Sequence, residues 1–131
     1  MISVRRMDHL NMGVRNIAET TQFYHDLFGF EEKESGVGID GAPFAIIGAA
    51  DRVYLCIYEY SDLSINEENL YVHHFGFHLD DFDLALKELR DRKIELNYGQ
   101  VIPWEKSRSA YITDPNGYEI ELVEKLGGDL H

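Results

Sequence analysis

The sequence has little cysteine and no long apolar segment. Its 131 residues contain one cysteine, Cys56, so no disulfide can form within the chain and no metal site can be built from several cysteines. No apolar run approaches the roughly 20 residues that a membrane-spanning helix needs. The first residues, Met1–Arg6, carry two arginines without an apolar stretch behind them, unlike a secretory signal. We therefore expect a cytoplasmic protein that does not associate with membranes.

Positive charge is also scarce. Lys and Arg together number 12 against 24 Asp and Glu, which gives a formal net charge of −12. A chain this acidic would be repelled by the phosphates of nucleic acid and by an anionic membrane surface, so neither is an expected partner. The excess of acid favours solubility, and it is compatible with a metal ion or a cationic small molecule as ligand.

Local sequence signals define the elements of the first half. Alternating apolar residues predict a strand over Met7–Val14. A helix is predicted over Ile17–Phe28, because Asn16 and Glu19 form a capping-box pattern and Gly29 suits a left-handed residue after the last turn. Three further extended segments are expected, at Phe30–Ser35, Pro43–Gly48 and Arg52–Tyr60, before a polar linker over residues 61–70.

The same order of elements then begins again. A strand over Tyr71–Leu79 is followed by a helix that Asp80 or Asp81 caps and that runs to about Arg92. Extended segments are predicted at Ile94–Tyr98, Ser109–Thr113 and Tyr118–Glu124. The run Asp114-Pro115-Asn116-Gly117 between the last two predicts a tight hairpin turn.

This order indicates an internal duplication. His9 and His74 are 65 positions apart, and the last strands of the two halves align with an offset of 66. We predict an α+β fold in one domain, residues 1–131. It contains two tandem βαβββ modules, at about 7–60 and 71–124, that form a half-open curved mixed sheet with the helices on its convex side. One module alone is too small to bury a good core.

Strand alternation places polar residues on the concave face. If the apolar residues pack on the helices, the opposite face receives His9 and Asn11 from the first strand, His74 and His78 from the fifth, and Glu121 from the last. Two imidazoles and one carboxylate on rigid strands can hold a divalent cation and leave positions open for substrate. On the residues alone, His73 or His78 competes with His74 for this role.

Three stretches of the chain resemble the vicinal oxygen chelate superfamily. They are Met7–Phe30, with its Met-Asp-His-Leu start and Leu-Phe-Gly-Phe end, Tyr71–Phe77, and Asp114–Leu122. The superfamily includes glyoxalase I, extradiol dioxygenases, methylmalonyl-CoA epimerase, fosfomycin resistance enzymes and metal-free bleomycin resistance proteins. The resemblance implies the glyoxalase-like fold and metal ligands at His9, His74 and Glu121, and it favours His74 over His73.

The chain departs from some members of this superfamily. Glyoxalase I and the epimerase have a fourth ligand, Glu or Gln, at the position that the sequence alignment gives to Leu55, which has no donor atom. Most extradiol dioxygenases carry two such double modules, so the chain is short for that group. Fosfomycin resistance enzymes are short and dimeric, and Val53–Ile57 and Arg108–Tyr111 resemble parts of theirs, although their potassium-binding loop is not evident in Trp104–Ser107.

The sequence therefore predicts a metal-dependent enzyme with a small-molecule substrate, similar to a fosfomycin resistance enzyme or a dioxygenase. The metal is one of Mn, Fe, Ni, Co, Zn or Mg and would act as a Lewis acid on a substrate oxygen. Candidate pocket residues are Asn11, His78, Arg108 and Tyr111. The alternative is a metal-free binding protein of the bleomycin resistance type, with a drug held near Phe44, Trp104 and Tyr111. The resemblance also implies a homodimer.

Overall fold

The computed structural model describes residues 1, 3, 5–66, 68 and 72–129, in two compact units, Met1–Ser64 and Ile65–His131. Each unit contains one four-stranded sheet. No helix among the described residues is both long enough and apolar enough to cross a bilayer. The α+β class with duplicated βαβββ order is confirmed.

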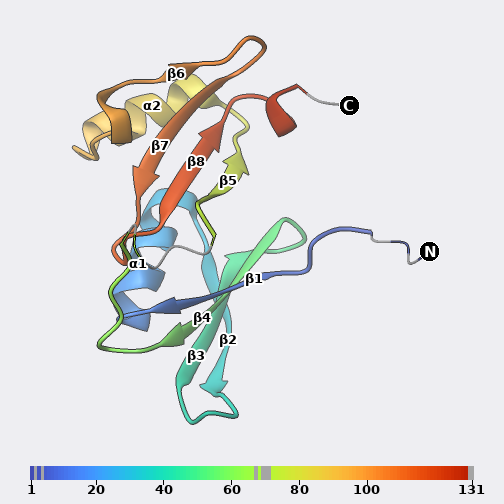
Figure 1. Ribbon diagram of the computed structural model, residues 1–131, viewed down its shortest axis with the longest axis vertical. Helices are drawn as coiled ribbons and strands as arrows, with labels where there is room; N and C mark the ends of the chain where they lie inside the picture. The colour runs from blue at the N-terminus through green and yellow to red at the C-terminus, as the bar shows by residue number, and fades with distance from the viewer. Residues whose placement is uncertain (2, 4, 67, 69–71, 130–131) are drawn as a thin grey trace. The chain divides into compact units, whose positions relative to one another are not determined.

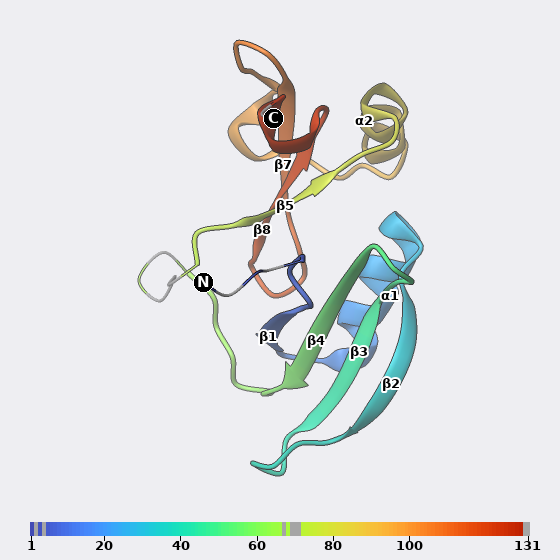
Figure 2. The same cartoon turned by 90° about the vertical axis from the view of Figure 1, so that its right-hand side faces the viewer.

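The first unit begins with a strand and a helix and continues with three antiparallel strands. Its elements are β1 (Leu10–Val14), α1 (Ile17–Phe28), β2 (Glu31–Val37), β3 (Pro43–Ala49) and β4 (Val53–Glu59). The sheet order is β1-β4-β3-β2, with β1 parallel to β4 and the other pairs antiparallel. Figure 2 shows α1 along one face of this sheet.

Helix α1 has the ends that its sequence predicts. The Asn16 side chain accepts a hydrogen bond from the Glu19 backbone N–H at 2.8 Å, which satisfies one donor that the helix leaves unpaired. Gly29 follows with φ 68°, a left-handed conformation that glycine adopts without a Cβ clash. Tyr24 of α1 is fully buried, and its ring stacks on Phe30, which directly precedes β2.

The second unit repeats this plan in the same order (Figure 1). Its elements are β5 (Phe75–His78), α2 (Phe82–Asp91), the short 3-10 turn η2 (Asn97–Gly99), β6 (Ile102–Pro103), β7 (Arg108–Thr113), β8 (Glu119–Val123) and η3 (Leu126–Gly128). The sheet order is β5-β8-β7-β6, and β5 is parallel to β8. Asp81 is the residue that caps α2, through a 2.9 Å bond from the Leu84 N–H.

One predicted strand is wrong. The segment Ile94–Tyr98 forms no strand, its last two residues belong to η2, and the strand of this region is Ile102–Pro103. Lys93 and Tyr98 both have left-handed backbones, with φ of 56° and 66°, which a side-chain-bearing residue adopts at a cost and which propensity does not indicate. The predicted first and fifth strands also start later, at Leu10 and Phe75, and Tyr71 lies outside the described residues.

The turn between β7 and β8 is formed as predicted. Asp114 Oδ1 accepts hydrogen bonds from the backbone N–H groups of Asn116 and Tyr118, both at 2.9 Å. Gly117 has φ 104°, where any other residue would be strained. This turn fixes the register of β7 against β8, so that Tyr111 pairs with Glu121.

The strand register corrects one part of the predicted repeat. Leu10 pairs with Leu55 in the first sheet, and Phe75 pairs with Ile120 in the second. Equivalent residues of the two units are therefore 65 positions apart in the first strands and also in the last strands. The sequence alignment with an offset of 66 is therefore one residue out. In the first unit the counterpart of Glu121 is Cys56, and Leu55 lies on the opposite, helix-covered face, where it is only 1% exposed.

Candidate metal centre

The structure brings His74 and Glu121 together in the second unit. In β8, Ile120 and Leu122 are buried on one face of the sheet, so Glu121, which lies between them, points to the other face. His74 directly precedes β5, which is the strand that pairs with β8. Its Nε2 lies 3.1 Å from Oε2 of Glu121, a distance suitable for two ligands of one metal ion.

The Glu121 carboxylate is held by hydrogen bonds on its other oxygen. Ser109 Oγ and the Tyr111 hydroxyl both donate to Oε1, at 2.7 and 2.9 Å, and Trp104 Nε1 donates to Ser109 Oγ at 3.0 Å. Burial, and then the bond to Glu121, raise the pKa of Tyr111 to about 12, so its hydroxyl remains a donor at neutral pH. Glu121 therefore presents Oε2 toward His74 in a fixed orientation.

A second carboxylate lies beside the same histidine. Glu119 Oε2 accepts hydrogen bonds from the Tyr98 hydroxyl at 2.7 Å and from Asn97 Nδ2 at 3.1 Å. Its other oxygen, Oε1, lies 4.0 Å from His74 Nδ1. The same Nδ1 atom of His74 lies 2.7 Å from Nδ1 of His73. His74 is thus contacted at both of its ring nitrogens.

The other residues of the predicted set lie in both units. His9 directly precedes β1, and its Nδ1 is 2.7 Å from Asp8 Oδ2, which leaves Nε2 available as a ligand. Asn11 is exposed on β1, beside the buried Met12. His78 is exposed at the end of β5, and by strand alternation it lies on the same face of the sheet as Gly76.

Arg108 does not lie on the face that carries Glu121. It donates hydrogen bonds to Glu124 and Asp83, and its guanidinium lies over the Phe82 ring of α2 at 4.8 Å. Arg108 and Tyr111 are three positions apart on one strand, so their side chains point to opposite faces. The structure therefore separates this residue from the other pocket candidates of its unit.

Position 56 shows what replaces a carboxylate in the first unit. Cys56 is buried, and burial together with the charge of Glu34 raises the pKa of its thiol. The counterpart of Glu121 is therefore a neutral thiol at neutral pH, neither a carboxylate nor the leucine that the sequence alignment placed there.

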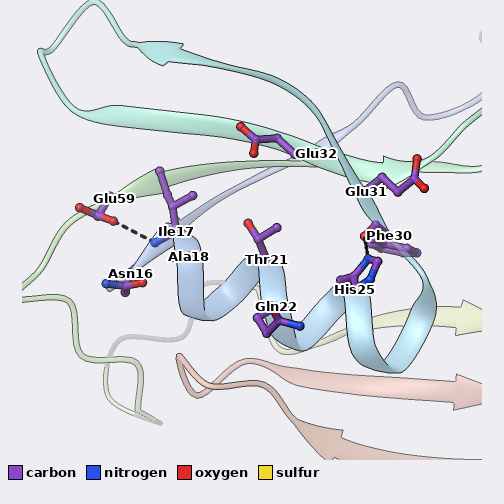
Figure 3. A pocket seen from close by; sticks show the side chains of 10 residues that line it. All are labelled: Asn16, Ile17, Ala18, Thr21, Gln22, His25, Phe30, Glu31, Glu32 and Glu59. Atoms are coloured by element: carbon purple, nitrogen blue, oxygen red, sulfur yellow. Dashed lines mark hydrogen bonds between the residues drawn. The ribbon is translucent and has the colours of Figure 1, made fainter.

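The first unit also contains a cavity of about 550 Å³ between α1 and the sheet (Figure 3). Its lining includes Phe30, His25 and the carboxylates of Glu31, Glu32 and Glu59. Glu59 accepts a hydrogen bond from the Ile17 N–H at 2.9 Å, so this carboxylate supports the start of α1. None of the predicted metal ligands lines this cavity.

The chain belongs to the Glyoxalase/Bleomycin resistance protein/Dioxygenase superfamily, whose sequence model matches residues 6–122. Among curated relatives, it is 24% identical over 121 residues to the metallothiol transferase FosB of Staphylococcus saprophyticus, covering 91% of this chain and 76% of that one. It is 23% identical over 133 residues to the protein YaeR of Escherichia coli, covering 95% and 100% of the two chains.

Solved structures of this superfamily have the same fold. The fosfomycin resistance protein FosX of Listeria monocytogenes superposes with a TM-score of 0.73 at 23% identity, over 99% of this chain and all of that one. A glyoxalase family protein of Enterococcus faecalis gives 0.76 at 18% identity, over 92% and 98% of the two chains. At these identities the likeness establishes the fold alone.

Sequence reasoning missed two residues that contact the centre, and the predicted site also leaves out a third, Glu119, although strand alternation places it on the face of Glu121. Ser109 could have been found by parity, because it is two positions from Tyr111 and therefore shares its face. Tyr98 carried no sequence signal, since its hydroxyl reaches Glu119 from a left-handed backbone conformation.

Proposed function

We propose that this protein is a divalent-metal-dependent enzyme that acts on a small, oxygen-bearing substrate, with His9, His74 and Glu121 as the metal ligands. The observation that carries the proposal is the contact between His74 Nε2 and Glu121 Oε2 at 3.1 Å. Glu121 is held for this contact by Ser109 and Tyr111. His9, the ligand that the superfamily resemblance assigns to the first unit, has its own orienting partner in Asp8.

The donor set fits a first-row divalent ion. Imidazole nitrogen and carboxylate oxygen are ligands that Mn, Fe, Co, Ni and Zn accept, and three protein ligands leave positions for substrate and water. The hydrogen bonds from Ser109 and Tyr111 are of the kind that orients ligating carboxylates in metal sites. When bound, the metal would polarise a substrate oxygen and stabilise negative charge that develops on it.

The protein's own groups prepare and surround this position. Tyr111 stays protonated at neutral pH, so it acts as a hydrogen-bond donor to Glu121 and not as a base. His78, exposed on β5, and Asn11, exposed on β1, are the polar groups that we assign to substrate binding. Arg108 has a structural role, because Glu124 and Asp83 occupy its guanidinium.

Among reactions of the superfamily we favour addition to a small epoxide. In such a step a nucleophile bonds to one ring carbon, the C–O bond of that carbon breaks, and the freed oxygen is protonated. The names of the relatives support this, since one is a metallothiol transferase and others are fosfomycin resistance proteins, one of them crystallised with Mn(II) and a dihydroxypropylphosphonic acid. A glyoxalase I reaction is disfavoured, because Cys56 replaces the carboxylate that would be its base.

Metal analysis tests the proposal. Protein is stripped with a chelator, reloaded with Mn²⁺, Zn²⁺ or Fe²⁺ and analysed by mass spectrometry of the metals and by titration calorimetry. We expect wild type to bind metal and His74→Ala to lose it, because that substitution removes a ligand. His25→Ala, which replaces an exposed histidine of α1 outside the proposed ligand set, is the matched control and should bind metal like wild type. Equal metal content in wild type and His74→Ala would overturn the proposal.

The reaction is tested separately with the loaded protein. Small epoxides, including epoxyphosphonates, are incubated with water alone or with a thiol, and their loss is followed by ¹H and ³¹P NMR. We expect metal-dependent ring opening that the His74→Ala variant lacks. If the metal binds and no epoxide is consumed, the metal site stands and the assignment of this substrate class is wrong.

A further inference from the structure

The second unit contains a group of potential metal ligands beyond the set proposed above. Nitrogen atoms of His73 and His74 and a carboxylate oxygen of Glu119 all lie within 4.8 Å of one another. Only His74 is shared with the proposed catalytic set. All three residues belong to one unit, so their arrangement is fixed by the β5–β8 pairing and the residues that flank it.

Glu119 offers an oxygen that the protein leaves without a donor. Its Oε2 is occupied by the Tyr98 hydroxyl and by Asn97 Nδ2. Its Oε1 is buried, has no hydrogen-bond partner among the described residues, and lies 4.0 Å from His74 Nδ1. A buried carboxylate oxygen without a donor is costly, and it is stabilised by a nearby cation. The orphaned oxygen is therefore available as a ligand for a cation at this position.

The two histidines converge on the same point. Their Nδ1 atoms lie 2.7 Å apart, close enough for both lone pairs to be directed at one ion after a small separation of the rings. For His74 this requires its proton to be on Nε2, and Glu121 Oε2, at 3.1 Å, can accept the hydrogen bond from that proton. A ligating histidine whose other N–H is bonded to a carboxylate is the usual arrangement of a protein metal site.

The internal repeat shows that this arrangement is specific to the second unit. In the first unit the equivalent histidine, His9, has the carboxylate of Asp8 2.7 Å from its Nδ1, which favours a proton on that nitrogen. At the equivalent position, 65 residues later, the chain has His73. Asp8 accepts the hydrogen bond of a protonated His9 Nδ1, whereas a neutral His73 can present a lone pair of its Nδ1 beside His74. The substitution thus converts an orienting partner into a potential ligand.

We propose that His73 Nδ1, His74 Nδ1 and Glu119 Oε1 form a second binding position for a first-row divalent cation of the zinc type. A neutral imidazole has one ring-nitrogen lone pair for a metal. A cation bound at His74 Nδ1 therefore leaves the proton on Nε2, where it is hydrogen-bonded to Glu121. His74 is then withdrawn from the catalytic set, and the two positions exclude one another. This exclusion rests on the proposed function, whereas the second position itself does not.

The test isolates the second position by removing the first. In His9→Ala, zinc binding is measured by calorimetry, and cobalt binding by the visible absorption of its d–d bands. We expect this variant to retain zinc binding. Adding His73→Ala or Glu119→Gln should weaken zinc binding by at least about tenfold, since loss of a ligand costs more than loss of an outer-shell partner. The cobalt absorption should change in the same variants.

Matched controls separate ligand loss from general damage. His25→Ala and Glu88→Gln replace an exposed histidine and an exposed glutamate elsewhere, and in the His9→Ala background they should leave zinc affinity unchanged. Thermal unfolding followed by circular dichroism confirms that each variant is folded, and His73 is exposed, so its replacement removes no core contact.

Two results would overturn the second position: no zinc binding by folded His9→Ala, or undiminished binding after His73→Ala and Glu119→Gln are added to it. The catalytic set is tested independently in the variant that carries His73→Ala and Glu119→Gln with His9 intact. Metal bound there and lost on adding His9→Ala supports the catalytic set. No metal bound there contradicts the catalytic set alone, without bearing on the second position.

Discussion

Arg108 joins three parts of the second unit through one side chain. Its Nη2 donates to Glu124 Oε1 at 2.8 Å, its Nη1 donates to Asp83 Oδ1 at 3.0 Å, and its guanidinium covers the Phe82 ring. The hydrogen bonds and charge of Arg108 hold the pKa of Glu124 below its ordinary value. In this way β7, the residue that follows β8 and the first turn of α2 are tied together by a charged group at the surface.

This ion pair predicts a pH-dependent contribution to stability. The pKa of Glu124 is lower in the folded state than in the unfolded state. Its contribution to folding stability is therefore complete at a pH above its unfolded-state pKa, and it is lost as the pH falls through its folded-state pKa. Glu124→Gln should therefore lower Tm at pH 7, and the deficit against wild type should shrink as the pH falls below about 4. Thermal unfolding from neutral to acid pH measures it.

Glu105→Gln, in the exposed loop before β7, is the matched control for this effect. Its Tm difference from wild type should be small at every pH. A Glu124→Gln deficit that stayed the same from neutral to acid pH would show that the carboxylate charge is not its cause.

Residue-scale features were predictable where local chemistry sets them. Asn16, Gly29 and the Asp114–Gly117 turn act through their own backbone and nearest neighbours, and the structure confirms all three. Arg108 illustrates the opposite case. Its type suggested a pocket residue, whereas strand parity relative to Tyr111 already placed it on the other face.

At the scale of elements, β3 and β4 pack closely at one glycine. A Cβ added to Gly48 would collide with the Val53 carbonyl oxygen and crowd the backbone of Tyr54. Gly48 pairs with Tyr54 in the antiparallel ladder, one residue from where the two strands are connected. A side chain here would force the strands apart, and backbone atoms cannot move aside as a flexible side chain could.

We therefore expect Gly48→Ala to destabilise the protein by about 1–3 kcal/mol, the usual cost of overpacking. Chemical denaturation, monitored by circular dichroism, gives the change in the free energy of unfolding. Gly76→Ala is the control, because a Cβ there would meet Glu121 O at 3.4 Å, an ordinary contact, so its effect should be small. Equal stability of Gly48→Ala and wild type would contradict the close packing.

Register was the element-scale property that sequence could not supply. The segment Val53–Tyr58 is apolar at every position, so hydrophobic alternation gives no phase for β4, and either Leu55 or Cys56 could face the helix. The pairing of β1 with β4, compared with that of β5 with β8, shows that Cys56 is the counterpart of Glu121. In β8, by contrast, Glu119 and Glu121 alternate with apolar residues, and the predicted face is confirmed.

At the scale of the whole molecule, the chain is a duplicated unit with a net charge of −12. The two units share strand order, parallel pairing of their first and last strands, and a histidine directly before the first strand. The sequence indicated the duplication because a strand, a capped helix and three extended segments are predicted in the same order in both halves.

The superfamily resemblance leads us to propose a homodimer. Sedimentation velocity at micromolar concentration should give a species of twice the 15.1 kDa chain mass. The measurement is made at about 0.15 M salt, where the Debye length is about 8 Å, so that repulsion between acidic surfaces does not mask association. A single species with the mass of one chain under these conditions would contradict the dimer.

The solitary buried thiol gives the molecule an internal reporter. Cys56 lies in β4, between β1 and β3, and no second cysteine competes for a thiol reagent. Burial restricts access to this thiol and raises its pKa, so we expect a thiolate-selective reagent to label Cys56 faster when the first unit opens. The rate of labelling in native buffer therefore reports on local opening of one half of the duplication, without any engineered tag.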